Sequence, residues 1–469
     1  MRSRVVRRVV PELSLTAAVL TALLGCTEPN TTPTEDPDAT AAAVSAAAAG
    51  DRYLVVLKEG NERLRATAAG TDVARFGGRV ERGHHDIGVL QVRGLTAATA
   101  GEVARQPDVE AVVKDRLVQW VGPGERRQHS AQRLQFGSQT NQRGAVLFDV
   151  FQWNLKRIKA QRAWNVSNQG EGVLICILDT GVDPRHIDLE GKLDLDVSTS
   201  FVENERADRD FVSHGTDMAS IASSNGIAMA SVSPDSRICS VKVVDRTGSG
   251  NFGDAIAGMM YVGTAGGIDV ANMSFGALFP RNDPDVRALA RAIQRAINFS
   301  TNRGVLFVAS AGNDGVNLNN PSVIKLPADL DNVISVGATG PIGQRQFDRV
   351  ASYSNFGRDG VDVFAPGGEV AFAENVLEDG LVTACSPSFR ESGTQPCASG
   401  DFYFFGVAGT SPAAAHVSGQ AAVIEADLPG NQSPAELTAC ILQSADALPR
   451  PAITANGRIN VLESLSCPA

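Results

Sequence analysis

The residue with the clearest chemical potential is Ser411, in the run Gly409-Thr410-Ser411-Pro412 that precedes three alanines. Gly409 allows a tight turn and Pro412 has the backbone angle of a first helical residue, so the sequence predicts that a helix begins here. The serine hydroxyl would then lie beside unpaired backbone N–H groups and the positive end of the helix dipole. Such a position suits a nucleophile that becomes an ester while a neighbouring oxygen gains negative charge. A serine that only caps the helix would show the same pattern.

Two further segments supply an acid and a base. Residues 174–179 form a short apolar run that ends in Asp179, which is typical of a buried parallel strand. Open α/β sheets bind their ligands at the carboxyl ends of such strands. His214 begins a second segment, which is rich in small residues. The order Asp179, His214, Ser411 is the order of the catalytic triad in subtilisin and not the order in chymotrypsin.

The chain resembles the subtilisin-like serine proteases (subtilase family, peptidase S8) in four motifs. They are Asp179-Thr180-Gly181, His214-Gly215-Thr216, Ser310-Ala311-Gly312-Asn313 and Gly409-Thr410-Ser411. The resemblance covers about residues 151–465, and a weaker one, to the family's inhibitor I9-type propeptide, covers 52–120. It implies an α/β, three-layer subtilisin-like fold in which helices flank a mostly parallel central sheet. A small ferredoxin-like α+β propeptide domain would precede that fold.

The resemblance gives each motif residue a role. Ser411 would attack the scissile carbonyl, His214 would take its proton, and Asp179 would hold the imidazole in the required tautomer. Asn313 and the backbone N–H of Ser411 would form the oxyanion hole. An asparagine that only shapes a turn is the alternative reading of Asn313.

The chain also departs from the family pattern, without losing a catalytic group. Asp217 stands where a second histidine is usual, and Pro412 and Ala415 replace the usual residues after the nucleophile. Among the other histidines, His416 should point elsewhere, because five residues turn a helix by about 500°. His186 is expected at the surface.

By resemblance, a peptide substrate binds as an added strand between two segments of small residues. These segments are Gly248-Ser249-Gly250 and Ser274-Phe275-Gly276. Residues 323–328 would line the base of the primary specificity pocket, with Lys325 where the family often has a small residue. A cation there would favour Glu or Asp in the substrate. In the alternative reading, Lys325 extends to solvent.

The N-terminal residues predict export. The basic residues Arg2, Arg4, Arg7 and Arg8 precede an apolar stretch, residues 13–24, that is too short to span a bilayer. Leu23-Leu24-Gly25-Cys26 resembles a bacterial lipobox. Residues 1–26 are therefore predicted to be a signal peptide, after which Cys26 is acylated. A plain secretory signal with a chance cysteine is the alternative.

The remaining chain divides into four predicted parts. They are a flexible tether at 27–51, an inhibitory propeptide domain at 52–120, a linker cut during maturation at 121–150, and a catalytic domain at 151–469. Within 52–120 a β-α-β-β-α-β pattern is expected. Its segments are 53–58, 61–75, 79–81, 88–92, 97–105 and 109–113. Cleavage in the linker would release the protease from its lipid anchor.

Cysteine usage fits an oxidising compartment, because the chain has seven cysteines and six remain if Cys26 is lipidated. The pairs that close local loops are Cys385 with Cys397 and Cys440 with Cys467. Cys176 and Cys239 lie in predicted buried strands, where they either pair or remain reduced as small hydrophobes, and the second reading is favoured. No metal-ligand spacing is present and the chemistry requires no cofactor, although the resemblance allows a structural calcium ion.

These features predict a secreted or envelope-anchored serine endopeptidase that is made as a self-processing zymogen. Its partners would be a protein or peptide substrate and its own propeptide, with a membrane reached only through the lipid on the precursor. The net charge is −10 and no long basic block follows the first residues, so the sequence does not indicate nucleic-acid binding. An inactive subtilase-fold binding scaffold, or a permanently inhibited zymogen, is the alternative. An aspartic protease would need a second carboxylate motif like the one at Asp179, and this sequence has none.

Overall fold

The computed structural model describes residues 51–121, 132–134, 142, 144–369, 376–389, 397, 402–428, 430, 432–449 and 456–467. The predicted signal peptide, Cys26, almost all of the tether and most of the predicted maturation linker lie outside these residues. All described residues belong to one compact unit. Within the described ranges, no helix is both long enough and apolar enough to cross a membrane.

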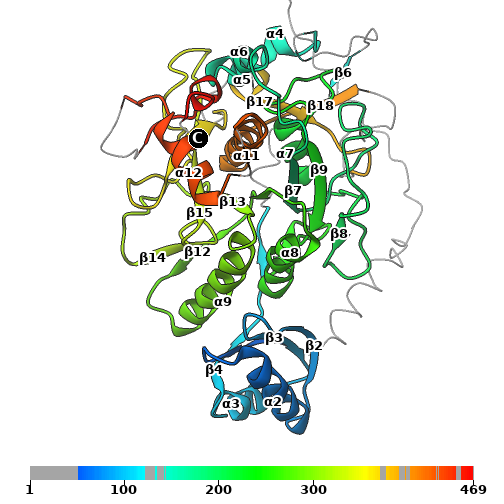
Figure 1. The fold of residues 1–469 in the computed structure, drawn as a ribbon, viewed down its shortest axis with the longest axis vertical. Helices are drawn as coiled ribbons and strands as arrows, with labels where there is room; N and C mark the ends of the chain where they lie inside the picture. The colour runs from blue at the N-terminus through cyan, green and yellow to red at the C-terminus, as the bar shows by residue number, and fades with distance from the viewer. Residues whose placement is uncertain are drawn as a thin grey trace, which may run out of the picture. The chain divides into compact units, whose positions relative to one another are not determined.

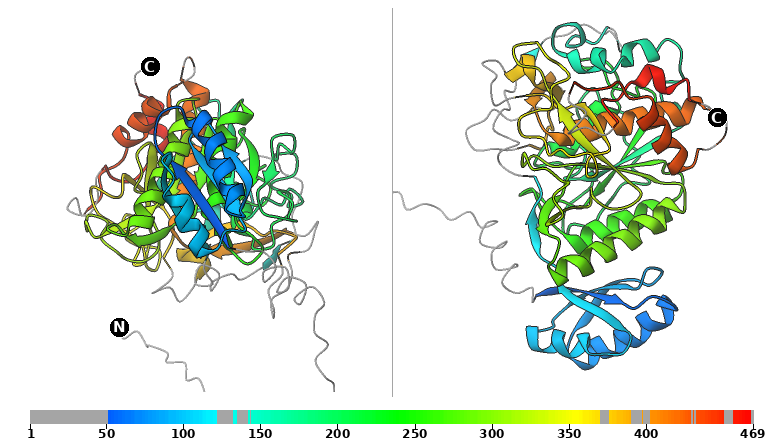
Figure 2. Two further views of the ribbon diagram at one scale, coloured as in Figure 1. Left: turned by 90° about the horizontal axis from the view of Figure 1, so that it is seen from below. Right: turned by 90° about the vertical axis from the view of Figure 1, so that its left-hand side faces the viewer.

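The first described region is a four-stranded antiparallel sheet with two helices on one face (Figures 1 and 2). Its elements are β1 (Arg52–Leu57), α2 (Glu62–Arg75), β2 (Arg79–His84), β3 (Val89–Arg93), α3 (Ala97–Ala104) and β4 (Val109–Lys114). The strand order β2-β3-β1-β4 is that of a ferredoxin-like domain. Because side chains alternate along a strand, Val55 and Leu57 pack with α2 and α3, whereas Leu54 and Val56 join the core of the larger domain.

The larger domain is built on a seven-stranded sheet in the order β16-β15-β13-β11-β7-β9-β8, and every strand pair in it is parallel. The strands are β7 (Leu174–Asp179), β8 (Thr199–Ser200), β9 (Arg237–Lys242), β11 (Val270–Met273), β13 (Leu306–Ser310), β15 (Val333–Thr339) and β16 (Val363–Pro366). The apolar run at 174–179 is thus a fully buried strand, as its composition predicts.

Helices cover both faces of this sheet (Figure 1). One face carries α7 (His214–Ala222), α11 (Thr410–Asp427) and α12 (Pro434–Gln443), and the other carries α8 (Phe252–Ala265) and α9 (Pro284–Thr301). Strand β7 shows how its sequence serves both layers, since Ile175 and Ile177 pack with α11 while Cys176 and Leu178 pack with α8 and α9. The predicted three-layer fold is confirmed.

Shorter elements surround these layers. They are β5 (Leu117–Gln119), β6 (Gln132–Leu134), α4 (Phe148–Phe151), α5 (Trp153–Arg157), α6 (Ala160–Ala163), β10 (Ser249–Asn251), β12 (Ala277–Pro280), β14 (Val323–Leu326), α10 (Val376–Asp379), β17 (Leu381–Ala384), β18 (Phe402–Val407) and α13 (Val461–Ser464). Strand β5 pairs with β10, β12 pairs with β14, and β17, β18 and β6 form a third small sheet.

Three disulfides cross-link the larger domain. The two predicted local bridges, Cys385–Cys397 and Cys440–Cys467, are present. The third joins Cys176 and Cys239, so the preference for reduced thiols at these positions is wrong. In the register of β7 and β9 the two cysteines are direct partners, with Cα atoms 4.4 Å apart, which is within the range a disulfide requires.

Candidate active site

The candidate site lies at the carboxyl ends of four adjacent strands of the central sheet. Asp179 is the last residue of β7, Lys242 ends β9, Ser310 ends β13, and Ser274 directly follows β11. Parallel strands bring their carboxyl ends to one edge, and open α/β sheets bind ligands there. Ser411 is the second residue of α11, so the predicted helix start is confirmed.

Asp179 and His214 are in direct contact. The Nδ1 atom of His214 lies 2.8 Å from Asp179 Oδ1 and 2.9 Å from Oδ2, and the backbone N–H of Thr180 donates to Oδ1 at 2.7 Å. Asp179 is fully buried, and His214 is 7% exposed. With Nδ1 held by the carboxylate, the opposite ring nitrogen is the one available for chemistry. His214 and Ser411 line one small cavity together with Gly409 and Val121.

Ser411 and Asn313 are joined through neighbouring residues. The Ser411 hydroxyl donates a hydrogen bond to the carbonyl of Ser274 at 3.0 Å. The side-chain oxygen of Asn313 accepts from the N–H of Thr410 at 2.8 Å and from its hydroxyl at 2.9 Å. These bonds aim the Asn313 amide nitrogen toward Gly409, since a Cβ at Gly409 would lie 3.4 Å from it. A side-chain donor is thus held next to the residues that precede Ser411.

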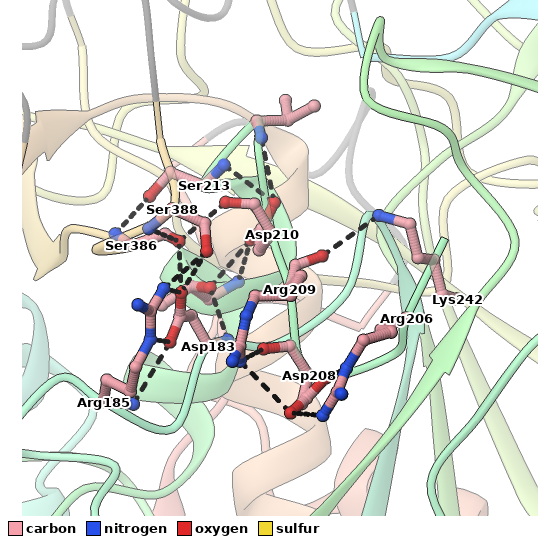
Figure 3. Close-up of polar contacts among 12 residues, drawn as sticks. Asp183, Arg185, Arg206, Asp208, Arg209, Asp210, Ser213, Lys242, Ser386 and Ser388 are labelled. Carbon is pink, nitrogen blue, oxygen red and sulfur yellow. Dashed lines mark hydrogen bonds and ion pairs between the residues drawn. The ribbon is translucent and has the colours of Figure 1, made fainter. Parts of the chain in front are cut away.

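Asp210 organises the site, and the sequence analysis missed it. Its buried carboxylate accepts from the backbone N–H of Ser213 at 2.8 Å (Figure 3), and also from the Thr180 hydroxyl and the backbone N–H of Thr216, each at 2.8 Å. It also accepts from the Thr216 hydroxyl at 2.7 Å and from the N–H of Val212 at 3.1 Å. Burial raises the pKa of Asp210, against the effect of these bonds. Asp210 therefore ties the end of the Asp179 strand to the start of helix α7. A carboxylate placed four residues before His214 was the signal available.

Lys242 supports the same turn from the neighbouring strand. Its side chain is fully buried, and its Nζ donates to the carbonyl of Thr180 and, at 3.2 Å, to that of Arg209 (Figure 3). It forms an ion pair with Glu205 at 3.1 Å. A buried ammonium costs much free energy unless such partners surround it. Lys242 thus fixes the backbone directly after Asp179.

Close backbone packing also positions His214. A Cβ atom at Gly215 would collide with the carbonyl of Gly181, and Gly181 itself has φ +107°, a conformation that L side chains rarely adopt. The two glycines therefore let the start of α7 lie directly against the turn that follows Asp179.

A second loop is fastened to this network (Figure 3). The Ser386 hydroxyl donates to the carbonyl of Asp210 at 2.6 Å, and its backbone N–H donates to the Ser213 hydroxyl at 2.9 Å. The Ser388 hydroxyl donates to the buried carboxylate of Asp183 at 2.6 Å. The segment beside the Cys385 disulfide is therefore held against the turn that carries His214.

Asp217, the departure from the family pattern, is also buried at this site. It is 2% exposed, accepts a hydrogen bond from the Ser213 hydroxyl at 3.1 Å, and lines the cavity that His214 and Ser411 share. Burial raises the pKa of Asp217 well above its ordinary value. Burial therefore disfavours the charged form of Asp217 relative to an exposed carboxyl.

Part of this chain occupies the predicted substrate edge. Strand β5 pairs antiparallel with β10, which contains Ser249 and Gly250, and the N–H groups of Trp120 and Val121 both lie 3.0 Å from the carbonyl of Gly248. The Trp120 ring stacks on Phe275, with centroids 4.4 Å apart, and presents its edge to Phe252. Residues 117–121 thus lie between the two segments that were predicted to bind a peptide.

The other predicted residues fall as follows. His416 is buried and bonded to Asn154 and to the Pro412 carbonyl, so its exclusion is confirmed. His186 is 2% exposed, so the expectation of a surface residue is wrong: its Nδ1 accepts from the N–H of Asp188 inside a packed loop. Lys325 is 5% exposed and does not extend to solvent. Among the described side chains, no group of three or more potential ligands could hold a metal ion, and calcium stays a prediction.

Comparisons with known proteins agree with this geometry. Residues 170–461 match the subtilase family, Peptidase_S8. The chain is 31% identical over 304 residues to the thermophilic serine proteinase of Bacillus sp. (strain AK1), covering 64% of this chain and 63% of that protein. It is 34% identical over 217 residues to subtilisin Savinase of Lederbergia lenta, covering 46% of this chain and 71% of that protein.

A solved structure extends the likeness to most of the chain. The epidermin leader peptide processing serine protease of Staphylococcus aureus shares the fold with a TM-score of 0.70 at 21% identity, over 88% of this chain and 97% of that one. This chain spans less than two thirds of the length of the Bacillus proteinase. Since the match to the family covers more than half of the 469 residues and includes Asp179, His214, Asn313 and Ser411, the chain belongs to the subtilase family.

Proposed function

We propose that this protein is a serine endopeptidase that hydrolyses peptide bonds through Asp179, His214 and Ser411. The observation that carries the proposal is the buried Asp179–His214 pair, whose imidazole faces a cavity shared with Ser411. Family membership and the serine proteases among the relatives support it. A binding scaffold would have no use for a buried acid–base pair beside a serine.

The reaction follows from the roles of these groups. Ser411 Oγ turns from the carbonyl of Ser274, gives its proton to His214 Nε2 and attacks the scissile carbonyl carbon. Asp179, bonded to Nδ1, stabilises the imidazolium that forms. His214 then protonates the departing amine, which leaves an acyl-enzyme on Ser411, and a water molecule activated by His214 hydrolyses this ester.

Asn313 supplies the oxyanion donor in this proposal. Its side-chain oxygen is held by Thr410, so its amide nitrogen and the backbone N–H of Ser411 can converge on the oxygen that becomes negative. In subtilisin itself, removal of the asparagine donor costs roughly 3 kcal/mol of transition-state stabilisation. The same order of effect is expected here.

Residues 52–120 act as the inhibitor of the precursor. Strand β5 occupies the edge β10 that a substrate strand would use, Trp120 fills the space over Phe275, and Val121 reaches the cavity of His214 and Ser411. An added strand of this kind satisfies the backbone groups of the edge and excludes a competing peptide. Cleavage between residues 121 and 150 would start its release.

The test is labelling by a serine-directed fluorophosphonate, with the wild-type chain and Ser411→Ala compared. We expect a covalent adduct on wild type only, and loss of cleavage between residues 121 and 150 in Ser411→Ala. A wild-type chain that folds and is cleaved but never labels would contradict the proposal. A chain that labels only after removal of residues 52–120 by another protease would be a zymogen that depends on a second enzyme.

Export and anchoring form a separate proposal that rests on the residues around Cys26. The precursor would carry a lipid on Cys26, and cleavage at 121–150 would free the protease into the secreted fraction or the cell envelope. Detergent-phase partitioning tests this directly. If the fragment that contains Ser411 remains in the detergent phase after maturation, release does not occur.

A further inference from the structure

Lys325 is a charged residue in the wall of the substrate cleft, and the proposed chemistry does not use it. It lies on β14, directly opposite Leu278 of β12, and β12 directly follows the segment Ser274-Phe275-Gly276. Its side chain is only 6% exposed. Lysine is rarely buried to this degree unless its ammonium has a purpose or a partner.

The glycines of the cleft show where the ammonium lies. A Cβ added to Gly312 would come within 2.5 Å of Lys325 Nζ, and one added to Gly276 would come within 3.2 Å of Cε. Gly312 directly precedes Asn313, and Gly276 lies two residues after Ser274, whose carbonyl accepts the Ser411 hydroxyl. The charged end of Lys325 therefore lies between the two backbone segments that flank the proposed scissile bond.

A substrate side chain must enter the same space. In the proposed binding mode, with the scissile carbonyl held by Asn313 and Ser411, the side chain on its amino side would enter between segments 274–276 and 310–313, which carry the two glycines next to Lys325. The glycines at 276 and 312 carry no side chains that would close this passage. The side chain would therefore end near Lys325 Nζ.

The local charges favour a carboxylate in that place. Lys325 Nζ lies 3.5 Å from Asp314 Oδ2, and the Asp314 side chain is 44% exposed, so this partner is at the solvent-facing edge of the pocket. The backbone N–H of Lys325 donates to Asp329 at 3.0 Å, which fixes the strand and not the ammonium. A substrate carboxylate near this cation would gain both a hydrogen bond and charge attraction, whereas an amide would gain only the hydrogen bond and a second cation would be repelled.

We propose that Lys325 makes this protease select substrates with an acidic residue, Glu or Asp, on the amino side of the cleaved bond. The inference rests on the proposed function and adds its substrate class. Hydrogen bonds to charged groups are worth enough to predict a preference for Glu over the isosteric Gln of roughly 10- to 100-fold in kcat/KM.

The experiment uses the full chain after maturation, with active sites counted by fluorophosphonate. Four peptides that differ only in the residue before the cleaved bond (Glu, Gln, Leu and Lys) are compared by kcat/KM per active site. We expect the wild type to prefer Glu over Gln at least tenfold. The Glu/Gln ratio should fall to near one in Lys325→Gln, stay high in Lys325→Arg, and reverse toward Lys substrates in Lys325→Glu.

Asp314→Asn is the matched control, because it removes the charge beside Lys325 and leaves the lysine in place. Its Glu/Gln ratio should equal or exceed that of the wild type. A wild-type ratio near one, or an unchanged ratio in Lys325→Gln, would overturn the inference while labelled active sites keep the proposed function intact. A wild-type chain without any labelling would overturn both. If Lys325→Gln fails to fold, a wild-type ratio near one, or a ratio in Asp314→Asn that falls below the wild-type value, overturns the inference.

Discussion

Two charged regions of this molecule differ in how deeply their charges are buried and in which groups bind them. Beneath the candidate triad, the buried Asp210 accepts hydrogen bonds from backbone N–H groups and hydroxyls, and Lys242 is held by two backbone carbonyls and by Glu205, all of them in the same domain. Where residues 51–121 meet helix α8, Arg52 forms ion pairs with Asp254 at 3.1 Å and with Glu81 at 3.2 Å, and its side chain is 20% exposed. In the first region the charges keep their partners only while the domain is folded. The second region joins two surfaces through a partly exposed cation, and the attraction between exposed charges weakens as the salt concentration rises.

The largest effect is expected inside the candidate triad. Asp179→Asn should lower kcat by about 10⁴-fold, because the amide favours the wrong tautomer of His214 and cannot stabilise the imidazolium. Steady-state kinetics per folded molecule measures this, with circular dichroism as the check on structure. Activity within tenfold of the wild type would place the catalytic acid elsewhere.

Asp210 tests whether the buried network holds the site together. Asp210→Asn replaces an acceptor of five hydrogen bonds by a group that must turn donors toward donors, so the free energy of unfolding should fall by about 3–5 kcal/mol. Denaturant unfolding in the Ser411→Ala background measures it without self-digestion. Asp208→Asn, which breaks surface pairs with Arg206 and Arg209, is the control and should change stability by less than about 1 kcal/mol. Equal effects of the two variants would show that the buried network around Asp210 stabilises the site no more than a surface ion pair does.

Trp120 tests the second region. Trp120→Ala removes the ring stacked on Phe275, which should weaken the binding of residues 117–121 in the cleft by about 3 kcal/mol, or roughly 100-fold. The measurement is the rate at which fluorophosphonate labels the uncleaved chain. Leu117→Ala, in the same region but 63% exposed, should leave that rate nearly unchanged. No acceleration in Trp120→Ala would mean that residues 117–121 do not guard the site.

The smallest effect concerns pH at the same interface. Asp115 accepts from the N–H of Gly253 at 3.0 Å at the start of α8, and burial raises its pKa to about 6 from an ordinary value of 3.8. Asp115 binds its proton more tightly when residues 51–121 are packed against α8 than when it is exposed to solvent. The stabilisation of this packing by the protonated carboxyl is therefore complete below pH 3.8 and is lost as the pH rises through 6. The full loss is no more than about 3 kcal/mol.

Labelling of the uncleaved chain should therefore accelerate between pH 4 and pH 7 by a larger factor in the wild type than in Asp115→Asn. His84 titrates in the opposite sense, since burial lowers its pKa to about 4, so only the difference between wild type and Asp115→Asn isolates Asp115. A variant with the wild-type pH profile would exclude Asp115 as the cause.

Local signals in the sequence predicted more of this molecule than long-range ones. The strand ending in Asp179, the helix starting at Thr410 and the β-α-β-β-α-β pattern of the first domain each depend on neighbouring residues, and each appears as expected. The Cys176–Cys239 bridge was misjudged because it requires knowing that β7 and β9 are adjacent and in register. The order of strands in a sheet cannot be deduced from patterns among residues that are neighbours in the sequence.

Polar residues of the interior were the other failure. Asp210 and His186 look like loop residues by composition, yet both are buried. Asp210 accepts from nearby backbone N–H groups and from the Thr180 hydroxyl, 30 residues away, and His186 accepts from the N–H of Asp188. The position of Lys325 depends likewise on glycines from two separate segments. A polar side chain is buried when the folded chain supplies its partners, and those partners are visible only in three dimensions.

The Cys176–Cys239 bridge makes the folded protein depend on the redox conditions under which it folded. It closes a loop of 63 residues that contains both Asp179 and His214, and a cross-link of that span disfavours the unfolded chain by about 4 kcal/mol. Both cysteines are fully buried in the middle of the sheet, where no reducing agent reaches them until the strands separate. A molecule that acquired the bond in an oxidising compartment would therefore keep it after moving into a reducing one, whereas a chain made under reducing conditions would have to hold the acid and the base together without it.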